Sequence, residues 1–227
     1  LTLDHALLAC GSVVLVELAS ETAPAGSVAL VAVSKRHGTD AIRAAYAAGQ
    51  RAFGENYVQE ALAKQAELAD LAIEWHFIGR IQANKTRPIA ERFAWVHSLC
   101  DPNHARRLDA QRPAGLPPLQ ACVQVNTSGE ASKEGLAPAA VAELLSACAA
   151  LERIQIRGLM TLPAPAQGEA DQRRPLRALR ELRDRLATAE RPLAVLSMGM
   201  SDDLEAAIAE GATLVRIGTA VFGPRPV

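Results

Sequence analysis

Two kinds of apolar stretch alternate along this chain. Short, nearly continuous runs of Val, Ile, Leu and Ala are separated by longer stretches in which apolar residues recur every three or four positions. The short runs are typical of strands buried on both faces, and the periodic stretches are typical of amphipathic helices. The pattern predicts strands at 28–34, 51–54, 74–79, 94–99, 119–126, 154–160, 194–198 and 213–217.

Helices are predicted between these strands. In the longest, Leu176, Leu179, Leu182 and Leu186 share one face among arginines and acids. A further helix is predicted at 6–19, where an internal glutamate and the missing basic flank argue against a signal peptide. The helical stretches between strands are 39–48, 56–68, 84–92, 138–150, 172–189 and 202–210.

The alternation of strands and helices predicts the fold. Eight strands in a chain of 227 residues indicate an α/β protein, a single (β/α)8 TIM-type barrel with an extra N-terminal helix. A doubly wound open sheet uses the same alternation with fewer strands and is the alternative. Because no Ser/Gly linker or block of like charge marks a boundary, one domain is predicted over residues 1–227.

Composition and charge narrow the functional classes. Charged residues make up 22% of the chain and the net charge is −1, so nucleic acid and acidic membrane surfaces are not expected partners. No run approaches the ~18 apolar residues that a membrane helix needs. The four cysteines lie far apart without metal-ligand spacing. We therefore expect no metal site and a cytoplasmic location, where thiols stay reduced.

Lys35 is the first candidate for chemistry. It directly follows the apolar run at 28–34, and burying an unpaired charge at the end of such a strand is costly. A lysine desolvated at the mouth of an α/β core loses proton affinity, and its neutral amine can attack a carbonyl carbon to form a Schiff base. The alternative is a strand-end lysine that reaches for solvent, which this position alone favours.

Two loops have chemistry suited to a phosphate group. In a parallel barrel the strand ends converge on one face, where phosphate binds most often through the loops after strands seven and eight. In the first loop, Ser201 is expected to cap a helix that begins at Asp202. In the second, Gly218 allows close approach of the backbone and the Thr219 hydroxyl can donate. A serine cap and a turn glycine would explain either loop alone, but the two together favour an anion site.

Arg216 is the one charged residue of the predicted eighth strand. It is flanked by Val215 and Ile217, so alternation places it on the opposite face from both, and in a barrel one face is the interior. An arginine that points inward needs a partner. A ligand ring nitrogen and a carboxylate such as Glu55 both remain open from the spacing.

The histidines carry less information. His76 and His97 lie within predicted strands and are expected to be hydrogen-bonded core residues. His37 lies in the loop beside Lys35, where it could tune the amine, but solvation is the preferred interpretation. No pair of histidines has metal-ligand spacing.

Several blocks of residues form a recognisable pattern. They are Ala32-Val33-Ser34-Lys35, Phe53-Gly54-Glu55-Asn56-Tyr57-Val58-Gln59-Glu60, Trp75-His76-Phe77-Ile78-Gly79, Gln82-Ala83-Asn84-Lys85, Gln124-Val125-Asn126-Thr127-Ser128-Gly129-Glu130, Arg157-Gly158-Leu159-Met160, Leu196-Ser197-Met198-Gly199-Met200-Ser201-Asp202-Asp203 and Arg216-Ile217-Gly218-Thr219. In this order, they closely resemble the YggS-like pyridoxal phosphate homeostasis family, which is related to the N-terminal domain of alanine racemase.

The resemblance implies a fold-type III barrel that binds pyridoxal 5'-phosphate (PLP), and it gives each candidate residue a role. By that resemblance, Lys35 would hold PLP as a Schiff base, Arg216 would face the pyridine nitrogen, and Asn56 would line the pocket. The phosphate would be bound by Ser201, Gly218 and Thr219.

The chain departs from the family pattern at Arg36-His37-Gly38, after the lysine, and at Arg80. Both departures are expected at the rim of the site, so ligand exchange could differ from the family while cofactor attachment should survive.

Three functions are candidates for this chain. The first is intracellular PLP (vitamin B6) homeostasis, in which the protein holds PLP without robust turnover and PLP-dependent apo-enzymes are candidate recipients. The second is an amino-acid racemase or other small PLP enzyme. Racemisation needs a second acid–base group opposite the lysine, but Tyr46 and Tyr57 fall in helices and the chain ends soon after its eighth strand. The third is a class I aldolase-type barrel.

The sequence does not decide the oligomeric state, for which a monomer and a weak dimer both remain open.

Overall fold

The computed structural model describes residues 28–129 and 134–224, and within them eight parallel strands close into a barrel. Neighbouring strands pair in chain order, and β8 returns to pair with β1. The predicted (β/α)8 barrel is confirmed. The strands are β1 (Ala29–Val33), β2 (Ala52–Glu55), β3 (Glu74–Phe77), β4 (Trp95–Leu99), β5 (Leu119–Gln124), β6 (Ile154–Met160), β7 (Val195–Ser197) and β8 (Leu214–Ile217).

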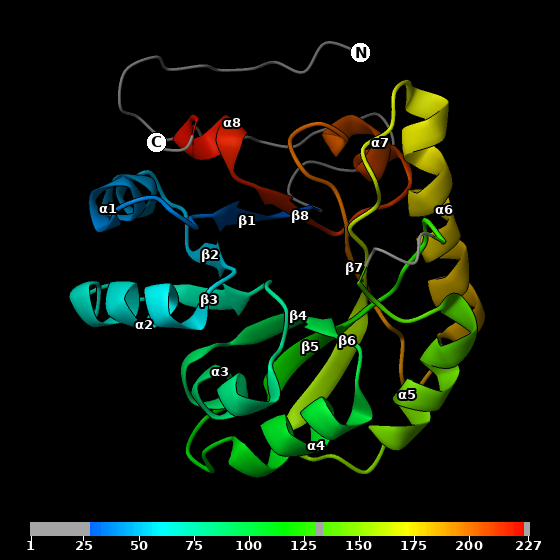
Figure 1. Cartoon of the computed structure of the whole chain (residues 1–227), viewed down its shortest axis with the longest axis horizontal. Helices are drawn as coiled ribbons and strands as arrows, with labels where there is room; N and C mark the ends of the chain where they lie inside the picture. The colour runs from blue at the N-terminus through cyan, green and yellow to red at the C-terminus, as the bar shows by residue number, and fades with distance from the viewer. Residues whose placement is uncertain (1–27, 130–133, 225–227) are drawn as a thin grey trace.

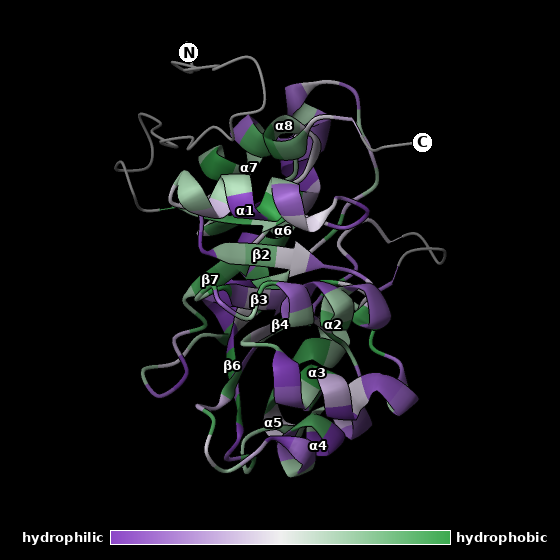
Figure 2. Cartoon of the chain, turned by 90° about the vertical axis from the view of Figure 1, so that its left-hand side faces the viewer, coloured by the Kyte–Doolittle hydropathy of each residue, from purple (hydrophilic) through white to green (hydrophobic). Residues whose placement is uncertain are grey.

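Helices follow one another around the outside of the barrel (Figure 1). Hydrophilic and hydrophobic residues are mixed along these helices (Figure 2), and the buried ones are apolar at positions such as Ile42 of α1 and Leu179 of α6. None of the helices in the described ranges is long and apolar enough to cross a membrane. The α-helices are α1 (Thr39–Ala47), α2 (Val58–Glu67), α3 (Thr86–Arg92), α4 (Pro102–Gln111), α5 (Val141–Ala147), α6 (Glu169–Leu186), α7 (Leu204–Ala209) and α8 (Thr219–Phe222), with 3-10 turns at Ala83–Lys85 and Pro138–Ala140.

Each of the eight predicted strands is present within a few residues, whereas the helices differ more. Helix α4 had not been predicted because only Ala105 and Leu108 of its ten residues are buried, so its apolar periodicity is weak. Its start signal is nonetheless clear, since the Asp101 carboxylate accepts a hydrogen bond from the Asn103 N–H at 2.7 Å. The short helix α8 was also missed. The helix predicted at 6–19 lies outside the described residues.

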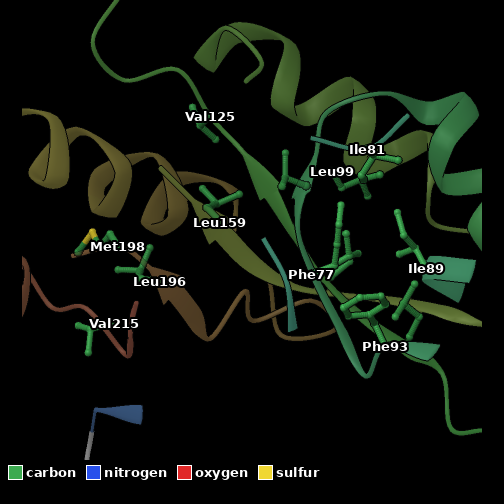
Figure 3. Packing of buried hydrophobic residues seen from close by; sticks show 14 of the residues in the cluster. Phe77, Ile81, Ile89, Phe93, Leu99, Val125, Leu159, Leu196, Met198 and Val215 are labelled. Carbon is green, nitrogen blue, oxygen red and sulfur yellow. The ribbon is translucent and has the colours of Figure 1, made fainter. Parts of the chain in front are cut away.

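The main apolar core lies between the strands and the surrounding helices. On one side, the rings of Phe77 and Phe93 meet edge-on with centroids 5.4 Å apart (Figure 3). In another part of the core, Leu196 and Val215 are fully buried (Figure 3). Burial on this scale leaves the barrel interior to a smaller, more polar set of side chains.

Two of those interior side chains are the strand histidines. His76 is 2% exposed, His97 is fully buried, and the two rings are hydrogen-bonded at 2.9 Å. The prediction that both are satisfied core residues is confirmed. Burial lowers the pKa of His76, and it lowers the pKa of His97 well below the ordinary 6.5.

The buried histidines predict a pH dependence of stability. Below about pH 6.5 the unfolded chain binds protons at these positions more fully than the folded chain, because burial lowers both folded-state pKa values. The unfolded state then binds more protons, so the free energy of unfolding should fall as the pH drops from 6.5 to 5. His97→Gln should reduce this slope by up to about 1.4 kcal/mol per pH unit. Urea unfolding at several pH values measures it, and an unchanged slope in the variant would contradict the assignment.

Candidate functional site

A cavity of about 300 Å³ opens at the carboxyl ends of the strands. All six residues predicted for the site line it, although they come from distant parts of the sequence: Lys35, Asn56, Ser201, Arg216, Gly218 and Thr219. The sequence did not assign the remaining lining residues to the pocket: Val33, His37, Ile78, Leu162, Met200 and Asp202. The volume lies at the lower end of the roughly 300–1,000 Å³ typical of small-molecule sites.

The backbone that carries Lys35 is held on both sides. On the preceding side, the Ser34 N–H donates to the Gly54 carbonyl at 3.0 Å and continues the pairing of β1 with β2. On the following side, Arg36 adopts a left-handed conformation with φ of 64°, which is uncommon for a residue other than glycine. Its N–H donates to Glu60 Oε1 at 2.5 Å. The partly buried Lys35 therefore projects from a turn with a fixed course.

A network of ion pairs and hydrogen bonds centred on Lys64 supports the turn that carries Lys35. The Lys64 ammonium, on α2, donates to Glu55 Oε1, Glu60 Oε1 and the Ser34 carbonyl, each at 2.7 Å. Glu55 is fully buried, and its Oε1 also accepts from the Ser34 hydroxyl at 2.6 Å. Burial raises the pKa of Glu55 in spite of these favourable contacts.

Sequence reasoning missed Lys64, although a signal existed. On α2 the buried positions are Val58, Ala61 and Lys64, so the lysine occupies the apolar face of an amphipathic helix. A lysine at such a position needs a buried acidic partner. Glu55 at the end of the preceding strand is that partner.

Asn56 reaches the cavity from the end of β2, where a glycine makes its position possible. A Cβ atom on Gly79 would lie 2.0 Å from the Asn56 carbonyl oxygen, so only glycine allows the two strand ends to approach this closely. Asn56 Oδ1 is buried and has no hydrogen-bond partner among the described residues. It is an acceptor available to a ligand donor.

Arg216 points into the barrel and is 3% exposed. Its Nη1 donates to Ser197 Oγ at 2.6 Å and its Nη2 donates to the Thr161 carbonyl at 2.9 Å. Burial lowers the pKa of Arg216 to about 10. The alternative of an ion pair with Glu55 is wrong, because Glu55 is bound to Lys64 and no described carboxylate forms an ion pair with Arg216.

The loop after β7 differs from its prediction. Ser201 does not cap the helix, because α7 begins at Leu204 with Asp203 at the N-cap position. The Asp203 carboxylate accepts from the Met200 N–H at 2.6 Å, which turns Ser201 outward at the cavity mouth. Thr219, which follows Gly218 at the start of α8, is also exposed and lines the same cavity.

The two departures at the rim behave differently. His37 was expected to be solvated, but it is 8% exposed and stacks on the Phe222 ring at 5.0 Å, because the left-handed turn at Arg36 brings it back toward α8. Arg80 is exposed and forms a 3.5 Å ion pair with Glu134.

The fold and the strand-end lysine define a class of barrel that is already known. Residues 16–226 match the family described as "Alanine racemase, N-terminal domain". The solved alanine racemase of Corynebacterium glutamicum shares the fold with a TM-score of 0.66 at 20% identity, over 89% of this chain and 58% of that chain.

More similar proteins narrow the family further. The chain is 59% identical over 199 residues to the pyridoxal phosphate homeostasis protein of Pseudomonas aeruginosa, which covers 88% of this chain and 85% of that protein. PipY of Synechococcus elongatus, solved with PLP bound, superposes with a TM-score of 0.79 at 43% identity, over 87% of this chain and 93% of PipY. The chain belongs to the pyridoxal phosphate homeostasis protein family, as its sequence blocks predicted.

The ionic network predicts a large effect of removing Lys64. Lys64→Met leaves Glu55 buried without its cation, and should lower the free energy of unfolding by about 3–5 kcal/mol. Adding Glu55→Gln to Lys64→Met should cost less than the sum of the single changes, because the two residues share one interaction. Urea unfolding measures both. Lys85→Met, at a partly exposed lysine, is the matched control and should stay within about 0.5 kcal/mol of wild type.

Proposed function

We propose that this chain binds PLP in the cavity at the carboxyl ends of the strands and takes part in PLP homeostasis, holding the cofactor without rapid turnover. The observation that carries the proposal is the convergence of Lys35, Asn56, Arg216 and the loops after β7 and β8 on one cavity. The similarity to PipY, which was solved with PLP bound, supports it.

The chemistry of the lining residues fits the cofactor. The cavity offers an amine at Lys35, an unpaired buried acceptor at Asn56 Oδ1 and a buried cation at Arg216. At the mouth, the Ser201 and Thr219 hydroxyls and the Gly218 backbone form a small polar rim suited to a phosphate. PLP has a matching group for each: an aldehyde, a hydroxyl, a ring nitrogen and a phosphate.

Each residue then has a defined task. When bound, PLP supplies an aldehyde that reacts with amines and a ring that can act as an electron sink. Lys35 would hold it covalently through its amine. Arg216 can only donate hydrogen bonds, so it would leave a ring nitrogen facing it unprotonated. This arrangement weakens the electron sink and suits a carrier better than an efficient catalyst.

Racemase activity has less support. A racemase needs an acid–base group on the face opposite the lysine, and neither tyrosine of this chain lines the cavity. Tyr46 lies on α1, where its hydroxyl accepts from the Ala72 N–H at 3.3 Å. Tyr57 precedes α2 and is 52% exposed. The exposed rim residues Ser201 and Thr219 leave the mouth accessible, which favours exchange of a held ligand with apo-enzymes in solution.

The test is the visible spectrum of the purified protein with PLP, before and after borohydride reduction. Wild type should acquire a visible band that borohydride bleaches, with the pyridoxyl group mapped to Lys35 by peptide mass spectrometry. Lys35→Ala should lose both the band and the adduct, while Lys85→Ala should keep them. Protein that stays colourless with PLP but is labelled at Lys35 by borohydride and a carbonyl substrate would instead indicate the aldolase-type alternative. Racemisation at rates typical of dedicated enzymes would refute the carrier role.

A further inference from the structure

A continuous chain of hydrogen bonds crosses the barrel interior from Arg216 to the opposite rim. Arg216 Nη1 bonds to Ser197 Oγ at 2.6 Å, and Ser197 Oγ bonds to His97 Nδ1 at 2.8 Å. His97 Nε2 bonds to His76 Nδ1 at 2.9 Å, and His76 Nε2 bonds to Glu74 Oε1 at 2.8 Å. Glu74 begins β3, so this series of hydrogen bonds ends at the amino ends of the strands, away from the cavity.

The bond between Ser197 and His97 spans the barrel. His97 lies on β4 and Ser197 on β7, which are not neighbours in the closed strand order. This contact therefore joins opposite walls through the interior. Arg216, Ser197, His97 and His76 are all 3% exposed or less, whereas the Glu74 side chain is 51% exposed. The series of hydrogen bonds therefore connects the cavity at one end to solvent at the other.

The two ends impose one direction on every hydrogen bond. The Glu74 carboxylate can only accept, so a neutral His76 carries its proton on Nε2 and accepts at Nδ1. A neutral His97 must then donate from Nε2 and accept at Nδ1, which makes the Ser197 hydroxyl the donor to His97. The Ser197 oxygen is left to accept, and Arg216, a donor only, supplies that bond. Every donor in this series of hydrogen bonds, from Arg216 to Glu74, is matched with an acceptor.

Burial keeps both histidines in the state that this direction needs. Desolvation is the largest cause of the lowered pKa of His76 and of His97. The Trp95 ring stacks on His76 with centroids 5.5 Å apart and planes 3° from parallel, which covers one face of the imidazole. The rings are thus held neutral and fixed in orientation.

We propose that Glu74, His76, His97 and Ser197 form a directional relay that positions the Arg216 guanidinium at the cavity. They are positioning residues, since none of the four lines the cavity, whereas Arg216 does. With one bond to Ser197 and one to Thr161, the guanidinium has fixed rotation and presents its remaining N–H groups to a ligand. The relay is a property of the cofactor-free chain, and its effect on PLP rests on the proposed function.

The direct test is the tautomeric state of the histidines, read by two-bond ¹⁵N–¹H NMR correlations on cofactor-free protein. His76 and His97 should each carry the proton on Nε2 and none on Nδ1. Glu74→Ala should shift the ring ¹⁵N signals of His97 as well as those of His76, although Glu74 does not touch His97. Glu152→Ala removes an exposed carboxylate just before β6, at the same end of the barrel, and should leave both signals in place. An Nδ1–H tautomer in wild type, or no response of His97 to Glu74→Ala, would overturn the relay.

The second readout is PLP affinity and the absorption maximum of the bound cofactor. Ser197→Ala removes the charge-assisted bond to Arg216, and should weaken PLP binding roughly tenfold or more and shift the maximum. Ser197→Thr keeps the hydroxyl and should restore both in large part. Glu74→Ala should weaken binding about threefold, and Glu152→Ala should not change it.

If wild type shows the expected tautomers but binds no PLP, the proposed function fails and the relay stands. If PLP binds equally well to wild type, Ser197→Ala and Glu74→Ala, the positioning role fails.

Discussion

Closing eight parallel strands into a barrel removes water from its interior, so every polar side chain placed there must find its partner inside. This constraint shapes the whole site. His76, His97, Ser197 and Arg216 come from four different strands, and each is hydrogen-bonded to the next. A connected set of polar side chains therefore crosses the interior, and the cavity lies at one end of it.

Two buried charges meet the constraint in different ways. Glu55 is compensated by a cation, since Lys64 binds it directly and also ties down the turn that carries Lys35. Arg216 has only neutral oxygens as direct partners, from Ser197 and Thr161. The first arrangement fixes the position of the reactive amine. The second leaves a desolvated guanidinium at the cavity, where a ligand can contact it.

Much of this could be predicted from the sequence, because strand alternation and strand-end polarity are local signals. The eight strands, the barrel and the six cavity residues all followed from such signals, together with a family resemblance. The wrong predictions for Glu55 and His37 concern residues whose partners lie on other elements of the fold. The pairing of Glu55 with Lys64 was not predicted because it joins a strand end to a helix face. The burial of His37 requires α8, a helix of four residues that carries no periodic signal.

Asn56 Oδ1, which has no hydrogen-bond partner among the described residues, and the desolvated guanidinium of Arg216 also have a cellular consequence. Both are destabilising in the empty protein, and a ligand that satisfies them raises the stability of the folded state by mass action. At a concentration a hundred times its Kd, such a ligand adds about 2.7 kcal/mol. Protein without ligand would then unfold and be degraded more often than protein with it. Through this linkage, the abundance of the protein would itself follow the supply of the ligand that it holds.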